Sequence, residues 1–222
     1  MSISKNLNNI KSQLPAHVTL VAVSKTKPVA DLMEAYNAGQ RIFGENKIQE
    51  MTDKWEVMPK DIEWHMIGHV QTNKVKYMAP YVSLIHGVDS LKLLQEINKQ
   101  AAKNNRVIDC LLQVYIAEEE SKFGLDEKEL EEVLKLVQND KENYKNTRIV
   151  GLMGMATFTE NKNQIEKEFK HLKTIFDKYS KLKTENCQLN TLSMGMSGDY
   201  QLAISCGSTM VRIGSSIFGG RN

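Results

Sequence analysis

The stretch VTLVAVSKTKP, residues 18–28, joins an apolar run to two lysines and a proline. The near-continuous run of apolar and β-branched residues at 18–24 predicts a strand that is buried on both faces. Pro28 favours the start of a helix just beyond it, because the first helical turn does not need the missing N–H. The stretch therefore predicts a strand, a short turn that carries Lys25, and then a helix.

The same order of a short apolar run and a longer amphipathic segment recurs along the chain. Helical spacing of apolar residues is clearest at residues 91–102, 130–137 and 165–182, and residues 3–14 form an extra leading helix. Ser90 and the pair Asp126 and Glu129 are suitable N-terminal caps for two of these helices. Eight candidate strands alternate with the helical segments, at residues 18–24, 41–46, 62–68, 83–89, 107–115, 148–155, 189–195 and 210–219.

Eight alternations of strand and helix favour a single (β/α)8 TIM barrel with an extra N-terminal helix. A doubly wound open sheet has the same local pattern and is the alternative. The count of eight favours the barrel, and so does the lack of a Gly-x-Gly-x-x-Gly motif after the first strand. We expect residues 1–222 to form one domain, because no linker divides the sequence and it ends just after the eighth strand.

The composition is that of an ordinary soluble globular protein. The formal net charge is +2 and no block of five like charges occurs, so we expect no nucleic-acid partner. The three cysteines are widely spaced, which favours a reducing compartment over a disulfide framework. The N-terminus lacks an apolar signal core and no run approaches transmembrane length, so we expect a cytoplasmic protein with no membrane partner.

In a barrel, chemistry is located at the carboxyl ends of the strands. Lys25 lies at the end of the first predicted strand, so its stem starts in the mouth of the barrel. Burial favours the neutral amine, which is the form that attacks an aldehyde. The alternative is a lysine that extends from the strand end into water.

Two turns rich in glycine and serine follow the last two predicted strands. One holds Ser197 and Gly198, and the other holds Gly214 and Ser215 just after Arg212. Barrels often bind phosphate at this place through backbone N–H groups. Because the first and last strands of a closed barrel are neighbours, a small phosphorylated aldehyde would span the distance from Lys25 to these turns. Pyridoxal 5′-phosphate (PLP) is such a molecule.

Seven segments resemble the pyridoxal phosphate homeostasis proteins, which are relatives of the amino-terminal barrel of bacterial alanine racemase. They lie in family order and cover nearly the whole chain. The segments are VAVSKTKP (residues 21–28), FGENKIQE (43–50), WHMIGHVQTNK (64–74), ESKFG (120–124), GLMGMAT (151–157), LSMGMSGDY (192–200) and VRIGSSIFG (211–219).

The resemblance implies that Lys25 holds PLP as a Schiff base. It also implies further cofactor contacts around the phosphate, at the rim and along the ring. The phosphate contacts are Ser197, Gly198, Arg212, Gly214 and Ser215, the rim contact is Asn46, and the ring contacts are Met153, Met155 and Ser193.

The resemblance also limits the expectation of catalysis. Alanine racemase uses two bases on opposite faces of PLP, and a second domain of a partner subunit supplies the tyrosine base. The sequence ends at Asn222 without such a domain, so we expect a monomeric PLP carrier without turnover, with PLP-dependent apoenzymes as candidate partners. A weak amino-acid racemase is the alternative, and a Schiff-base aldolase is a third possibility. His65 and His69 are four residues apart, but no glutamate follows His65 as a zinc motif requires, so we expect no metal site.

Overall fold

In the computed structural model, which describes residues 2–118, 123–181 and 183–220, eight parallel strands close into a barrel. Neighbours along the chain pair with each other, and the ring closes where β9 pairs with β1. This closure confirms the predicted TIM barrel and excludes an open doubly wound sheet, whose two edge strands would lie apart. The barrel strands are β1 (Thr19–Val23), β2 (Ile42–Glu45), β3 (Glu63–Met66), β4 (Leu84–Val88), β5 (Ile108–Gln113), β6 (Thr147–Met153), β8 (Cys187–Met196) and β9 (Met210–Ile213).

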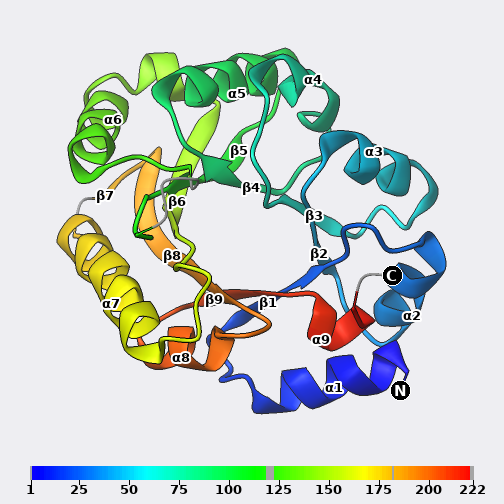
Figure 1. Cartoon of the computed structure of the whole chain (residues 1–222). Helices are drawn as coiled ribbons and strands as arrows, with labels where there is room; N and C mark the ends of the chain where they lie inside the picture. The colour runs from blue at the N-terminus through cyan, green and yellow to red at the C-terminus, as the bar shows by residue number, and fades with distance from the viewer. Residues whose placement is uncertain (1, 119–122, 182, 221–222) are drawn as a thin grey trace.

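The helices surround the ring of strands, as Figure 1 shows in a view down the barrel. They are α1 (Ile3–Gln13), α2 (Val29–Asn37), α3 (Ile48–Val57), α4 (Val75–Met78), α5 (Leu91–Lys103), α6 (Glu127–Asn139), α7 (Lys162–Tyr179), α8 (Tyr200–Ser205) and α9 (Ser215–Phe218), with 3-10 turns at Thr72–Lys74 and Glu142–Tyr144. Ser90 caps α5, and Asp126 and Glu129 form a capping box at α6, as predicted. Among the described residues, no helix is both long and apolar enough to span a membrane.

The structure differs from the sequence prediction at three elements. The eighth predicted strand, residues 210–219, ends at Ile213, and residues 215–218 form α9 instead. A two-residue strand, β7 (Lys183–Thr184), pairs antiparallel with β8 outside the ring and was not predicted. The predicted helix at residues 165–182 begins earlier, at Lys162, and ends at Tyr179, while Leu182 lies outside the described residues.

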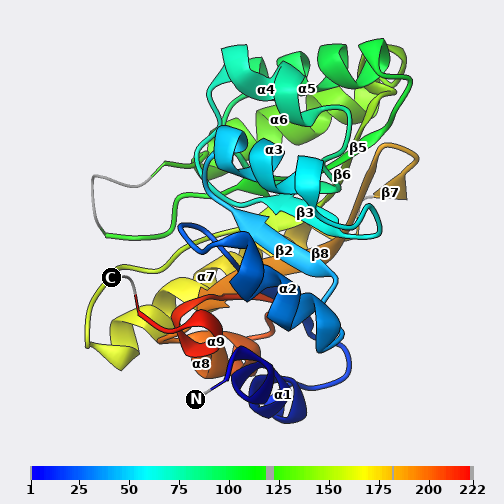
Figure 2. The same ribbon diagram turned by 90° about the vertical axis from the view of Figure 1, so that its right-hand side faces the viewer.

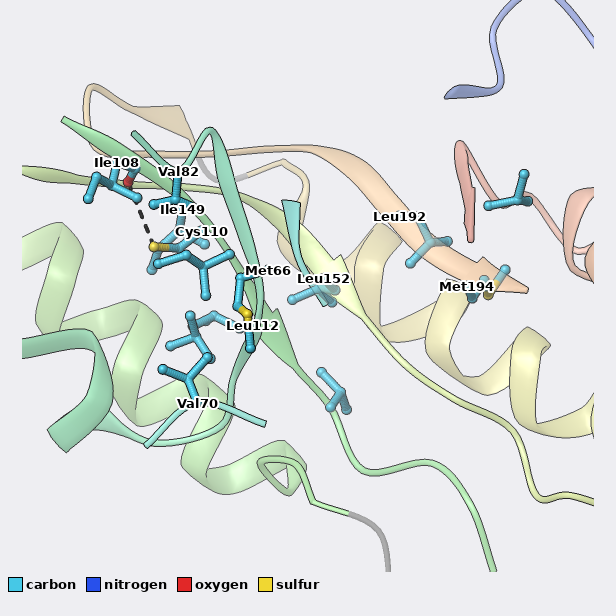
Figure 3. Close-up of a cluster of buried hydrophobic side chains, with 14 of the residues drawn as sticks. Met66, Val70, Val82, Ile108, Cys110, Leu112, Ile149, Leu152, Leu192 and Met194 are labelled. Atoms are coloured by element: carbon cyan, nitrogen blue, oxygen red, sulfur yellow. Dashed lines mark hydrogen bonds between the residues drawn. The ribbon is translucent and has the colours of Figure 1, made fainter. Parts of the chain in front are cut away.

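Each barrel strand buries both of its faces, because alternate side chains point to opposite sides of a strand. One face packs against the helices and forms the large apolar core, part of which is drawn in Figure 3 around Cys110 and Leu112. The other face points into the barrel, where Val21, Leu84 and Met210 form a smaller apolar cluster with Leu111 and Met153. This double burial explains why the strands are near-continuous apolar runs.

The leading helix α1 packs on the outside of the barrel against α9 and α2 (Figures 1 and 2). Asn6 donates a hydrogen bond from Nδ2 to the carbonyl oxygen of Ile217 at 3.1 Å, and the backbone N–H of Ser4 donates to Glu34. The predicted extra helix is therefore confirmed, and it supports the short helix that follows the last barrel strand.

Candidate functional site

A cavity of about 590 Å³ opens at the carboxyl ends of the barrel strands. Its described lining contains Lys25, Lys27 and Arg212 but no aspartate or glutamate. A cavity with cationic side chains and no carboxylate favours an anionic ligand. The lining residues are Val23, Lys25, Lys27, Asn46, Ile67, Gly68, His69, Gln113, Phe123, Met155, Phe158, Met196, Ser197, Gly198, Arg212, Gly214, Ser215 and Gly219.

Lys25 is half-buried at this mouth, two residues beyond the end of β1. The side chains alternate across the strand, so Val23 and Lys25 face the cavity while Ser24 is buried on the helix side. Thr26 follows with φ of 65°, in the left-handed region. The turn therefore reverses direction immediately after the lysine.

A buried ionic cluster holds the turn from the helix side. Lys54 on α3 donates from Nζ to the carbonyl oxygen of Ser24 at 2.8 Å and to Glu45 and Glu50 at 2.7 Å each. The Ser24 hydroxyl donates to Glu45 at 2.6 Å, and the N–H of Thr26 donates to Glu50 at 2.6 Å. Burial raises the pKa of Glu45 above its usual value in spite of Lys54. This cluster fixes the backbone on both sides of Lys25.

The two turns predicted to bind phosphate lie together in the structure. The N–H of Gly214 donates to the hydroxyl of Ser197 at 3.2 Å, which joins the turn after β9 to the turn after β8. The first residues of α9, Ser215 and Ser216, have no carbonyl one turn earlier in their own helix, so their N–H groups can bind a ligand. A Cβ added at Gly198 would meet nothing within 4 Å. The two turns thus leave room for an anion beside backbone donors.

Arg212 contributes its charge from below these turns. It is only 4% exposed, and Nη1 donates to the carbonyl oxygen and the hydroxyl of Ser193 at 3.0 and 2.6 Å. Nη2 donates to the carbonyl oxygen of Gly154 at 3.2 Å. Burial lowers the pKa of Arg212 to about 10, so the guanidinium is still charged at neutral pH.

Eight of the ten predicted site residues line the cavity, and two do not. Met153 and Ser193 are both 0% exposed. Met153 packs in the cluster inside the barrel, and Ser193 bonds to Arg212 beneath the cavity. Both point inward but lie too deep to reach the surface of the cavity, a depth that the sequence pattern does not reveal.

Ten lining residues were not predicted as site residues from the sequence, among them His69, Gln113, Phe123 and Phe158. The ring of His69 stacks on Phe123 with 4.3 Å between centroids, and its Nδ1 lies 3.1 Å from Asp89. His69 and Phe123 do lie in segments that carry the family resemblance, which was a usable signal. Residues 120–122 of the ESKFG segment lie outside the described residues. No group of three potential metal ligands occurs in the part of the chain that the structure describes.

The fold and the site define the class of this protein as a closed (β/α)8 barrel with cationic side chains at its mouth. The model of the family described as "Alanine racemase, N-terminal domain" matches residues 1–222. The chain therefore belongs to the alanine racemase N-terminal domain family. Relatives at least 37% identical that cover more than nine tenths of the chain place it, within that family, among the pyridoxal phosphate homeostasis proteins.

The relatives named pyridoxal phosphate homeostasis protein match over nearly their whole length. The protein of Haemophilus influenzae is 37% identical over 235 residues, which cover 100% of this chain and 97% of that protein. The protein of Aquifex aeolicus is 40% identical over 203 residues, which cover 91% of this chain and 86% of that protein.

Solved structures agree with this grouping. PipY of Synechococcus elongatus, in a structure with PLP bound, is 33% identical, with a TM-score of 0.88 over 98% of this chain and 100% of that chain. Alanine racemase of E. faecalis is 16% identical, with a TM-score of 0.75 over 99% of this chain and 58% of that one. The racemase likeness shows the shared fold alone.

Proposed function

We propose that this protein binds PLP in the cationic cavity, with Lys25 holding it as a Schiff base, and that it serves the cell's PLP and amino-acid balance without turnover. One observation carries the proposal. Lys25 and the two glycine–serine turns line the same cavity, which has no carboxylate among its described lining residues. An amine and an anion cradle in one cavity match the two ends of a phosphorylated aldehyde.

The residues present fit this cofactor. When bound, PLP would supply an aldehyde carbon that the Lys25 amine would hold as a Schiff base, with one water molecule released. The backbone N–H of Ser215, the hydroxyl of Ser197 and the open space at Gly198 suit the phosphate. Asn46 and Met155 belong to the rim and the ring side of the same cavity. Arg212 supplies positive charge from below.

The lining gives little support to a racemase. Exchange of an amino acid's α-proton between two faces needs a second acid–base group opposite the lysine. The described lining has no tyrosine and no carboxylate, and its one histidine, His69, is stacked on Phe123 and paired with Asp89. The names of the relatives likewise refer to homeostasis rather than to a reaction. We therefore propose a carrier that acts as a monomer and supplies PLP-dependent apoenzymes.

Borohydride trapping tests the proposal. The protein is incubated with PLP and reduced, and the modified peptide is identified by mass spectrometry. We expect the pyridoxyl adduct on Lys25 and its loss in Lys25→Ala. Lys76→Ala, which removes an exposed lysine on α4, should be labelled like the wild type. An adduct that stays in Lys25→Ala, or that is absent from the wild type, would overturn the assignment.

A further inference from the structure

A chain of four hydrogen-bonded side chains crosses the inside of the barrel from the cavity towards its opposite end. Nη1 of Arg212 donates to the hydroxyl of Ser193 at 2.6 Å. That hydroxyl lies 3.1 Å from Nδ1 of His86, and Nε2 of His86 lies 3.0 Å from Nδ1 of His65. All four are polar side chains that are buried inside the barrel.

The chain is built from four different strands and is almost completely buried. Arg212 on β9, Ser193 on β8, His86 on β4 and His65 on β3 are between 0% and 4% exposed. His65 lines a second cavity of about 450 Å³, which lies at the amino ends of the strands. Polar groups buried this deeply must be hydrogen-bonded to be tolerated. The four side chains therefore satisfy one another across the barrel.

The direction of the hydrogen bonds follows from Arg212 and from the need to pair the buried hydroxyl proton of Ser193. A guanidinium only donates, so the Ser193 oxygen accepts from it. The Ser193 hydroxyl proton then has Nδ1 of His86 as its acceptor in the described contacts. A neutral imidazole with an accepting Nδ1 carries its proton on Nε2, which donates to Nδ1 of His65. His65, whose Nδ1 accepts, in turn carries its proton on Nε2, and the residue lines the lower cavity.

Burial keeps both rings neutral, as this direction requires. It lowers the pKa of His65 to about 3, and burial followed by the charges of His65 and Arg212 holds the pKa of His86 well below its usual value. A protonated ring would donate from both nitrogens and could not accept from Ser193. Neutral histidines and a charged arginine therefore form one polarised chain.

We propose that Ser193, His86 and His65 are positioning residues that hold the Arg212 guanidinium at the floor of the cavity, with both histidines protonated at Nε2. The effect on PLP rests on the proposed function, whereas the protonation pattern does not. The guanidinium donates to three oxygens, the carbonyl and hydroxyl oxygens of Ser193 and the carbonyl oxygen of Gly154, so it cannot swing away from the cavity and its charge stays directed at the ligand.

The protonation pattern is tested first on the protein without PLP. Correlation of ring nitrogens with their protons by NMR distinguishes a protonated from an unprotonated nitrogen. We expect His65 and His86 to show a protonated Nε2 and an unprotonated Nδ1 at neutral pH. A protonated Nδ1 on His86 would overturn the proposal, whether or not Lys25 binds PLP.

The positioning role is tested with two buried serines. Ser193→Ala removes the 2.6 Å acceptor of Arg212, and we expect PLP to bind about tenfold more weakly. Ser208→Ala is the matched control, because Ser208 is also 0% exposed but, among the described residues, its hydroxyl bonds to the backbone oxygens of Leu192, Met194 and Met210 alone. Ser193→Thr keeps the hydroxyl and should restore most of the affinity. Equal PLP affinities for Ser193→Ala and Ser208→Ala would refute the role.

Discussion

The role of a glycine at the cavity depends on how much space surrounds its Cα atom. A Cβ added at Gly68 would lie 2.5 Å from the carbonyl oxygen of Asn46, so only glycine lets these two strand ends approach. Gly198 is different, because a Cβ there would meet no atom within 4 Å and yet the residue lines the cavity. Gly68 therefore supports the fold, and Gly198 keeps space for a ligand.

This difference predicts the effect of Gly198→Ala. The added methyl group enters the space proposed for the phosphate, so PLP should bind about tenfold more weakly, or ~1.4 kcal/mol. The free energy of unfolding without PLP should stay within about 0.5 kcal/mol of the wild type. Fluorescence titration with PLP and urea unfolding measure the two effects.

Gly220→Ala is the matched control for this variant. A Cβ at Gly220 also meets nothing within 4 Å, and Gly220 is not among the lining residues. Gly220→Ala should bind PLP like the wild type. Unchanged PLP binding in Gly198→Ala would show that the phosphate lies elsewhere.

The residues of the site were predictable to different degrees. Lys25 and Ser197 lie just beyond the ends of predicted strands, and a side chain or turn at a strand end reaches the mouth of a barrel. Gly214 lies inside the strand predicted at residues 210–219, and the structure places it in the turn just after Ile213. Ser193 and Met153 were predicted to touch the cofactor but are completely buried. Period-two alternation indicates which face a side chain occupies, but it does not indicate how far below the mouth the side chain lies.

At the scale of elements, α3 positions the turn after β1. Lys54 reaches from the last turn of α3 to the carboxylate of Glu45 and the backbone of Ser24, and all three are less than 7% exposed. The second oxygen of the Glu45 carboxylate has no partner among the described residues. The positive charge of Lys54 is therefore the main group that stabilises the buried carboxylate of Glu45.

We predict that Lys54→Met lowers the free energy of unfolding by about 3–5 kcal/mol, because it leaves Glu45 as an unpaired buried charge. Urea unfolding at neutral pH measures the loss. Lys47→Met, an exposed lysine next to the same helix, should change stability by less than about 0.5 kcal/mol. The double variant Glu45→Gln with Lys54→Met should regain part of the loss. A loss of the same size in Lys47→Met would argue against the buried ion pair.

The elements themselves were mostly visible in the sequence. Apolar runs predicted each barrel strand, and the caps Ser90 and Asp126 mark the helices that they begin. The error at residues 210–219 has a physical cause. Residues 214–219 are apolar enough to continue a strand, but Gly214 leaves the sheet and α9 packs under α1. Contacts between the two ends of the chain decide that helix, and they cannot be inferred from local pattern.

At the scale of the whole molecule, the barrel encloses two neutral histidines. Burial lowers the pKa of His65 to about 3 and holds that of His86 well below its usual value, whereas in the unfolded chain both have pKa values near 6.5. Below pH 6.5 the unfolded state therefore binds more protons than the folded state. Stability is complete above this pH and falls as the pH decreases towards the folded pKa values.

Lowering the pH from 7.5 to 5.0 should reduce the free energy of unfolding by about 2 kcal/mol for each of these histidines. Urea unfolding at a series of pH values gives the slope. In His65→Gln, the part of this pH dependence that comes from the two buried histidines should fall by roughly half. This expectation holds whatever the free energy of unfolding of the variant at pH 7.5. His171→Gln removes an exposed histidine on α7 and serves as the control. If the wild type had the same free energy of unfolding at pH 5.0 and 7.5, this would contradict the claim that both buried histidine rings are neutral.

The sequence by itself determined the alternation of strands and helices, the count of eight and the residues that stand at the strand ends, because these depend on local patterns of apolar and turn-forming residues. Tertiary structure alone decided how Lys54 reaches the turn that holds Lys25, and how Arg212, Ser193, His86 and His65 join into one chain. Closing the barrel brings side chains from distant strands into hydrogen-bond distance, and the depth at which each one lies depends on the register between the strands rather than on its neighbours in sequence.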